Sequence, residues 1–180
     1  MDLLAIGYFL STVSVNINTT VKEFQVDLDN SSLGDAGTKS LMQSICRSMD
    51  PHSVVNTRLV MYLNDNEIHE DGASHIADVL SKTSILHNLI LRHNPCLSDT
   101  GARFIANGLK RNTAIKSLSL SKCGITSKGA KDLSIAVAEH PSLKKLFIHN
   151  NPLGDEGIAH LSECLKQNWT LKHLYRYPFL

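Results

Sequence analysis

Apolar residues recur along this chain at a regular interval that is much longer than one helical turn or one strand. Aligning the chain on five glycines gives successive steps of 35, 29, 28 and 28 residues. Each unit opens with an apolar-x-apolar pattern, which predicts a short strand, and continues with apolar residues at helical spacing. The repeat therefore predicts one strand, one turn and one helix per unit. The aligned glycines are Gly37, Gly72, Gly101, Gly129 and Gly157.

Two apolar positions in each strand lie two residues apart, so they face the same side of a sheet. A single unit cannot bury both this face and its helical stripe, whereas stacked units bury them in one core. Consecutive strands joined by a helix run parallel. The predicted fold class is therefore α/β: a curved solenoid, or horseshoe segment, with parallel strands on the concave face and helices on the convex face. The last apolar strand positions are Leu28, Leu63, Leu91, Leu120 and Ile148.

Three segments carry a family resemblance: LILRHNPCLSDTGARFIANGL, LSLSKCGITSKGAKDL and LFIHNNPLGDEGIAHLSECL. They resemble leucine-rich repeats of the ribonuclease-inhibitor-like class and are similar to the repeat arrays of NOD-like receptors. The period of 28–29 residues and the Gly-Ala start of the helix are marks of that class. The resemblance also implies a ladder of Asn or Cys side chains that bond to turn backbone groups. Its expected members are Ser31, Asn66, Asn94, Cys123 and Asn151.

The pattern divides the chain into an array of about five units over residues 23–176, flanked by irregular segments at 1–22 and 177–180. Alternation at Val13, Val15 and Ile17 suggests a further strand in the first segment. Two insertions are expected in connections: one around Pro51, and one extra residue, Cys96, in the third turn. A sixth strand is expected to begin at Leu174.

Composition narrows the class of protein. Eighteen basic residues against 17 acidic ones give a net charge of +1, which does not indicate a dedicated nucleic-acid binder. The apolar run near the N-terminus follows Asp2 and no basic residue, unlike a secretory signal, and no run reaches the ~20 apolar residues that a membrane span needs. The four cysteines form no CxxC pair and no zinc-ligand spacing, so we expect no metal and a reduced, cytoplasmic setting.

No motif of a phosphate-binding loop, a serine hydrolase, a zinc protease or a dinucleotide-binding fold occurs in the sequence. The nine histidines are predicted to face solvent, His140 among them, because none has an acid and a base in register. Cys123 is expected to be a ladder residue and Cys164 a small core residue. We therefore expect no catalytic residue, no cofactor and no enzymatic activity.

Residues between the apolar strand positions are predicted to face the concave surface. Exposed aromatic and arginine side chains are favoured in protein interfaces, so this face is the expected site for a protein partner. Acidic residues gather toward its N-terminal end, at Asp27, Asp29 and Asp65, and basic residues toward its C-terminal end, among them His93 and Lys145, which favours an acidic or dipolar partner. The predicted partner-binding residues are Tyr62, Asn64, Ile90, Arg92, Ser119, Ser121, Lys122, Phe147, His149 and Tyr175.

The sequence thus favours a non-catalytic protein-interaction module. The resemblance to NOD-like receptor arrays implies cytosolic recognition or autoinhibition in innate immune signalling. An alternative is a GTPase-activating protein of the Ran type, which resembles the same repeat class but has more repeats and a long acidic tail. A third hypothesis is an inhibitor of a secreted nuclease, although such inhibitors are acidic and cysteine-rich. The sequence specifies neither the partner nor an oligomeric state.

Overall fold

The computed structural model describes residues 22–48 and 57–175, which form a single parallel sheet backed by helices. The sheet has the strand order β1-β2-β3-β4-β5-β6, so strands adjacent in sequence are adjacent in space. The strands are β1 (Lys22–Asp27), β2 (Thr57–Tyr62), β3 (Leu86–Ile90), β4 (Ser117–Ser119), β5 (Lys145–Phe147) and β6 (His173–Tyr175). The helices are α2 (Gly34–Ser48), α3 (Glu70–Lys82), α4 (Ser98–Leu109), α5 (Ser127–Ala138) and α6 (Gly154–Gln167).

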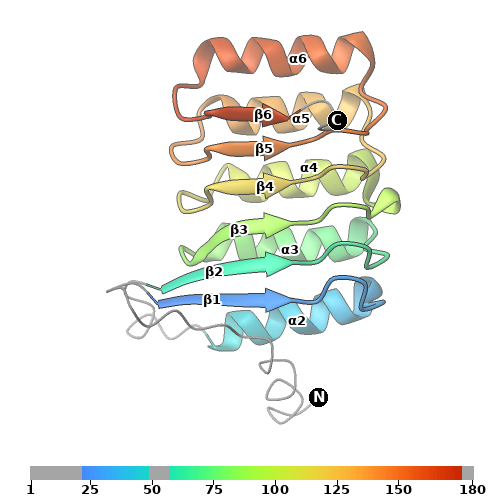
Figure 1. Cartoon of the computed structure of the whole chain (residues 1–180), viewed down its shortest axis with the longest axis vertical. Helices are drawn as coiled ribbons and strands as arrows, with labels where there is room; N and C mark the ends of the chain where they lie inside the picture. The colour runs from blue at the N-terminus through green and yellow to red at the C-terminus, as the bar shows by residue number, and fades with distance from the viewer. Residues whose placement is uncertain (1–21, 49–56, 176–180) are drawn as a thin grey trace.

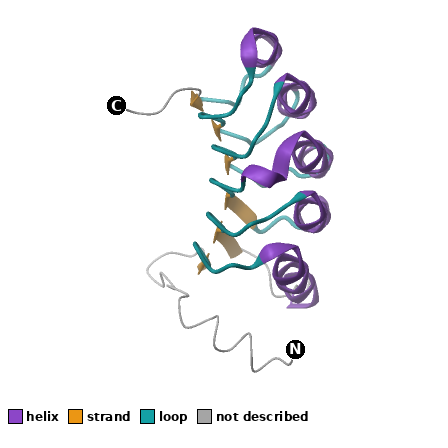
Figure 2. Ribbon diagram, turned by 90° about the vertical axis from the view of Figure 1, so that its right-hand side faces the viewer, coloured by secondary structure: helices purple, strands orange, loops and turns teal. Residues whose placement is uncertain are grey.

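The strands line one side of the stack and the helices line the other, as Figures 1 and 2 show from two directions. Every strand pair is parallel, and a helix connects each strand to the next. Helices are wider than the strand spacing of about 4.8 Å, so such a stack curves with its strands inside. The predicted α/β solenoid, with strands on the concave face and helices on the convex face, is confirmed, and β6 contains Leu174 as expected.

The core lies between the sheet and the helices, where the repeating apolar positions meet. Leu63, Leu91, Leu120 and Ile148 have 0% of their surface exposed. Each directly follows its strand and donates its backbone N–H to the last residue of the next strand, as Leu63 does to the Ile90 carbonyl at 2.8 Å. Full burial of such a side chain stabilises the fold by about 1.5–3 kcal/mol. The periodic apolar pattern is therefore the pattern of the core.

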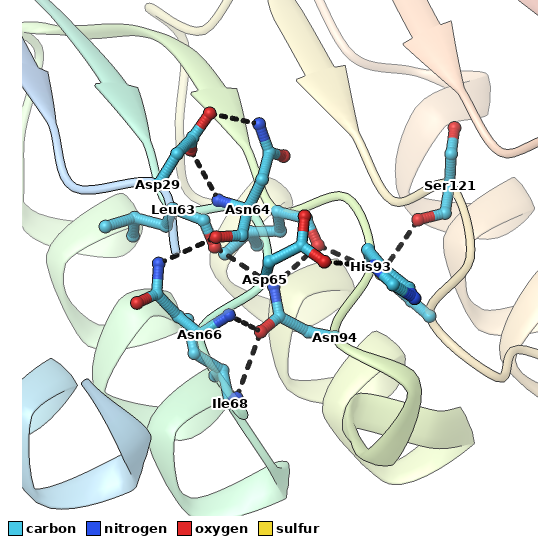
Figure 3. A network of polar contacts seen from close by, with 11 residues as sticks. Asp29, Leu63, Asn64, Asp65, Asn66, Ile68, His93, Asn94 and Ser121 are labelled. Carbon is cyan, nitrogen blue, oxygen red and sulfur yellow. Dashed lines mark hydrogen bonds and ion pairs between the residues drawn. The ribbon is translucent and has the colours of Figure 1, made fainter. Parts of the chain in front are cut away.

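A ladder of side chains joins the turns that follow the strands. The Asn94 Oδ1 accepts hydrogen bonds from the N–H groups of Asn66 (3.1 Å) and Ile68 (3.0 Å) in the preceding turn. Its Nδ2 donates to the carbonyls of Leu63 (3.1 Å) and Leu91 (2.8 Å). Figure 3 shows Asn66 and Asn94 pointing into these turns. One amide thus satisfies four buried backbone groups that belong to two repeats.

Asn66 and Asn151 make the same kinds of contact in their own turns, so the predicted ladder is confirmed at these positions. Cys123 replaces the amide in the fourth unit, and its Sγ–H donates to the Leu91 carbonyl at 3.2 Å. Burial raises the pKa of this thiol to about 12, which keeps it protonated and able to donate. The predicted ladder role of Cys123 is confirmed.

A second ladder, which the sequence did not predict, joins the loops that follow helices α3, α4, α5 and α6. Asn112 accepts from the N–H groups of Ala114 and Ile115, both at 2.8 Å, and donates to the Leu80 and Thr83 carbonyls at 2.8 and 3.0 Å. Asn168 accepts from the N–H groups two and three residues further along its own loop.

His140 stands midway between Asn112 and Asn168, 28 residues from each. Its Nδ1 accepts from the N–H groups of Ser142 (3.3 Å) and Leu143 (3.1 Å), as the asparagine oxygens do in their own loops. Only 2% of its surface is exposed, so the prediction of a solvent-facing side chain is wrong for this histidine. The reason is that its ring occupies a ladder position inside the stack. Burial, followed by the nearby charge of Lys116, lowers its pKa from 6.5 to about 4.

The repeat glycines let neighbouring helices approach closely. A Cβ atom on Gly129 would lie 2.7 Å from the Asp99 Oδ1 and 2.8 Å from the Ile125 Cγ2, too close for either contact. Asp99 uses that oxygen to accept from the N–H groups of Thr126 (2.7 Å) and Gly129 (3.0 Å). Burial alone would raise the pKa of Asp99, but these hydrogen bonds outweigh it and lower the pKa. A carboxylate on one helix therefore caps the start of the next helix.

Two departures from the regular repeat lie in connections. The extra residue in the third turn, Cys96, is accommodated by the 3₁₀ helix η2 (Pro95–Leu97). The register between β2 and β3 shifts between Leu59 and Val60, where β3 has one residue, His87, more than β2. The first insertion, around Pro51, and the strand suggested at residues 13–17 lie outside the described residues.

Replacing Asn94 with alanine is expected to lower the free energy of unfolding by about 3 kcal/mol or more. The change leaves two buried N–H groups and two carbonyls without their side-chain partner, and each unpaired buried group costs about 1–3 kcal/mol. Urea unfolding followed by circular dichroism measures the loss. Asn107→Ala, at an exposed position of α4, serves as the control and is expected to change stability by less than about 0.5 kcal/mol. Equal effects of the two substitutions would contradict the ladder's role.

Replacing His140 with asparagine is expected to remove part of the acid sensitivity of the fold. In the wild type the unfolded state binds a proton near pH 6.5 and the folded state only near pH 4. Stability is therefore lost as the pH falls from 6.5 to 4, by about 3 kcal/mol from this group. Asparagine fits the ladder without titrating, so the stability difference between variant and wild type should widen across this range. Unfolding curves at several pH values test this, and parallel pH profiles would contradict it.

Candidate protein-binding surface

The side chains between the buried strand positions form the concave face of the sheet. The strand register places Asp27 opposite Tyr62, Tyr62 opposite Ile90, and Ile90 opposite Ser119. It continues with Ser119 opposite Phe147 and Phe147 opposite Tyr175. These six residues form one column across the strands, as the repeat alignment predicted. We call them the central column.

Most of the predicted partner-binding residues are accessible. Arg92 is exposed, and seven others are partly buried: Tyr62, Asn64, Ile90, Lys122, Phe147, His149 and Tyr175. Ser119 and Ser121 are different, with 8% and 0% of their surface exposed. The prediction that these two serines are available to a partner is therefore wrong. They are the shortest side chains of their columns, and Ser121 lies under His149, whose Nδ1 is 3.0 Å from the serine Oγ.

An aromatic cluster lies at the C-terminal end of the central column. The rings of Phe147 and Tyr175 are stacked, with centroids 4.3 Å apart and an interplanar angle of 4°. His173 lies on Tyr175 at 5.6 Å and 13°. Tyr62 does not join this cluster, because β3 and β4 separate its strand from β5. The aromatic cluster of Phe147, His173 and Tyr175 is thus one pre-ordered region of the face, separate from Tyr62 and Ile90.

Polar pairs link neighbouring turns just beyond the strands. Asp29 accepts from the backbone N–H of Asn64 at 2.7 Å and from its Nδ2 at 2.8 Å. Asp65 and His93 form an ion pair in the next two turns, and Figure 3 shows both pairs. These contacts hold the acidic N-terminal part of the face in place. They also mean that His93 is already paired with an acid and adds less free positive charge than the sequence suggested.

The third residue after each of the strands β1 to β5 adopts a left-handed backbone conformation. Asp65, His93 and Lys122 have φ values of 54°, 62° and 55°, and Asn30 and Asn150 lie in the same region. Asn, Asp and His tolerate this region better than most side chains, while lysine is unusual there. The conformation turns the chain sharply away from the strand. These positions therefore lie at the rim of the concave face rather than within its strands.

Positive charge is concentrated on the C-terminal half of the face. Burial lowers the pKa of His149, and the neighbouring charges of Arg92 and Lys122 lower it further. The imidazole is thus held neutral beside two cations.

Sequence reasoning missed a second group of basic residues at the amino ends of the strands: Arg58, His87, Lys116, Lys144 and Lys172. The last four recur at steps of 29, 28 and 28, so the repeat period itself was the available signal. We call this group the basic row.

The described part of the chain shows no arrangement suited to metal binding, since no group of three or more His, Cys, Asp or Glu side chains could hold an ion there. Cys123 and Cys164 are buried, and burial raises their pKa values to about 12 and about 11. Both therefore stay protonated at neutral pH, unlike a nucleophilic cysteine. Among the described helices, none is long and apolar enough to cross a membrane.

A parallel concave sheet, convex helices, a 28–29-residue period and an Asn/Cys ladder together define the class. This chain is a leucine-rich-repeat protein of the ribonuclease-inhibitor-like class. A family model described as "Leucine Rich repeat" matches residues 111–134, which run from the end of α4 into α5.

Relatives of two kinds show the same class. The chain is 33% identical over 138 residues to the ribonuclease inhibitor of Mus musculus, covering 76% of this chain and 29% of that protein. It is 32% identical over 162 residues to "NACHT, LRR and PYD domains-containing protein 3" of Bos taurus, covering 89% of this chain and 15% of that protein. It is 33% identical over 142 residues to "NACHT, LRR and PYD domains-containing protein 5" of Homo sapiens, covering 78% of this chain and 11% of that protein. The chain thus spans less than a third of the length of these relatives.

A solved structure with the same fold is "Leiomodin-1 Actin-Binding Site 2 (ABS2)". It aligns with a TM-score of 0.59 and 22% sequence identity, covering 86% of this chain and 70% of that chain. At this identity the likeness concerns the fold alone.

Thiol reactivity provides a test of the chemistry assigned to the cysteines. In the folded protein, Cys46 and Cys96 are exposed and should react quickly with a chromogenic disulfide reagent. Cys123 and Cys164 should react only after unfolding, because their thiols are buried and protonated. Labelling at pH 8 with and without denaturant, followed by peptide mapping, measures this. Rapid labelling of Cys123 in the folded state would contradict its ladder role.

Proposed function

We propose that this chain is a non-catalytic interaction module that binds a protein partner on the C-terminal half of its concave face. The observation that carries the proposal is the aromatic cluster beside cationic side chains. Phe147 and Tyr175 form an ordered, partly exposed apolar region, and Arg92 and Lys122 flank the same half of the sheet. Aromatic and arginine residues in such surroundings are the usual hot spots of protein interfaces.

The rigidity of this surface supports the proposal. Strands β2 to β5 are hydrogen-bonded on both sides, β6 is bonded to β5, and the core lies beneath them, so their side chains lose little further freedom when a partner binds. The relatives that carry the same repeats are a ribonuclease inhibitor and proteins named for NACHT, LRR and PYD domains. We extend to this chain the expectation of a cytoplasmic role in innate immune recognition or signalling. A basic nuclease is a poor fit as the partner, because the C-terminal half of the face is itself cationic.

A double substitution on the face tests the proposal. Phe147→Ala with Arg92→Ala is expected to reduce capture of the partner at least about tenfold, since loss of one hot spot costs 2 kcal/mol or more. The measurement is quantitative mass spectrometry of proteins captured from cell lysate by the immobilised wild-type chain and by the variant.

A matched pair on the convex side is the control. Ile135→Ala with Arg103→Ala removes one exposed apolar residue and one exposed arginine from α5 and α4. This variant is expected to capture the same partner as the wild type. Circular dichroism and thermal unfolding confirm that both variants are folded. Equal capture by the face variant and the wild type would overturn the concave site.

A further inference from the structure

The basic row runs across the amino ends of the strands, next to the central column. Its members His87, Lys116, Lys144 and Lys172 are linked through their backbones. The N–H of Lys116 bonds to the His87 carbonyl at 2.7 Å, and that of Lys144 to the Lys116 carbonyl at 2.8 Å. The N–H of Lys172 continues to the Lys144 carbonyl at 2.9 Å. Successive backbones are therefore held at the strand spacing of about 4.8 Å, which presents the side chains as a continuous line.

No ion pair within the described residues neutralises the charge of the row. The described residues contain four ion pairs, and none of them includes a member of the row. Glu23, in register with Arg58 on β1, stands at the N-terminal end and marks where the basic character stops. The pKa of Lys116 is lowered by burial and then by the charges of Lys144 and Arg58. The basic side chains thus repel one another, and an external anion would relieve this repulsion.

Further basic and aromatic residues border the row toward the C-terminal end. Lys145 and His173 occupy the next position along β5 and β6. The exposed residues Lys110 and Arg111 lie in the loop that precedes Lys116. Trp169, the only tryptophan of the sequence, lies in the loop that leads into β6 and is 90% exposed. The row therefore combines a line of positive charge with apolar groups at one end.

We infer that the basic row binds an acidic, extended polypeptide segment of the protein partner, which lies across the amino ends of strands β2–β6. The inference rests on the proposed function, since it names the chemistry of the partner on the same concave face. An extended peptide places the side chains of one face about 6.8 Å apart, a spacing that flexible lysines 4.8 Å apart can match. The aromatic end suits an apolar residue that follows the acidic stretch.

The aromatic geometry favours a polypeptide over a nucleic acid. Proteins that bind single strands stack bases on open aromatic faces. Here Phe147 covers one face of Tyr175 and His173 lies against the same ring, so little of Tyr175 is open to a base; Trp169, 90% exposed, is a single ring beside the row and not a series of stacking platforms. The net charge of the whole chain is only +1, which gives little general attraction for a phosphate backbone. A short line of charge with ring edges beside it suits carboxylates and apolar side chains.

Charge reversal at two exposed members of the row tests the inference. The full chain is titrated into a fluorescein-labelled octaglutamate peptide, and fluorescence anisotropy is measured at about 50 mM salt, where screening is weak. Lys144→Glu with Lys172→Glu is expected to weaken binding at least about tenfold. Lys144→Gln with Lys172→Gln should weaken it less, by about threefold, because charge is removed but not reversed.

The matched control reverses two charges on the convex helices. Arg103→Glu with Lys131→Glu gives the same net charge as Lys144→Glu with Lys172→Glu but is expected to weaken binding less than about twofold. Equal weakening by the two charge-reversed variants would overturn the inference, since it would indicate general attraction without a local site. Tighter binding of labelled octathymidylate than of octaglutamate would also overturn it, in favour of a phosphate backbone. Neither of these results would contradict the proposed function, which the variant with Phe147→Ala and Arg92→Ala tests independently.

Discussion

Hydrogen bonds from buried side chains to the backbone of neighbouring turns are the interaction on which this structure depends. Stacking repeats buries the turns on both sides, where water cannot pair their N–H and C=O groups. One asparagine, such as Asn94, pairs four of these groups at once and belongs to two repeats. Apolar burial drives the units together without fixing how far one unit is shifted along its neighbour. The ladder hydrogen bonds form at only one such shift. The ladders therefore set the register of the sheet.

The register in turn determines the arrangement of side chains on the concave face. Because Ile90 lies opposite Ser119 and Ser119 opposite Phe147, each repeat contributes one side chain to each column. A column is consequently as uniform or as varied as the residues at one repeat position. The central column is varied and has aromatic residues at one end, while the basic row is uniform over four repeats. Both properties follow from the same stacking, and in each of these repeats the row residue lies three residues before the residue of the central column.

The parts of this arrangement that the sequence predicted are those governed by the repeat period. Leu63, Leu91 and the ladder residue Cys123 are buried, as their positions in the repeat predict. His140 was missed because an imidazole nitrogen does the work of an amide oxygen, which no residue-type rule for the ladder anticipates. Ser121 was assigned to the correct face of the sheet. Its exposure, however, depends on the size of neighbouring side chains such as His149, which the repeat pattern does not give.

The basic row escaped prediction for a different reason. Alternation along a strand assigns faces only where the strand is regular, and β3 carries an extra residue, the row member His87, opposite Leu59 and Val60 of β2. The row also contains repulsion between Lys116 and Lys144, and beyond the opposite, carboxyl end of β4 Lys122 holds a left-handed backbone that lysine disfavours. Such features lower stability and contribute nothing to the core. The two ladders and the continuous core offset this cost, so the repeat can hold a line of like charges whose mutual repulsion a bound anion would reduce.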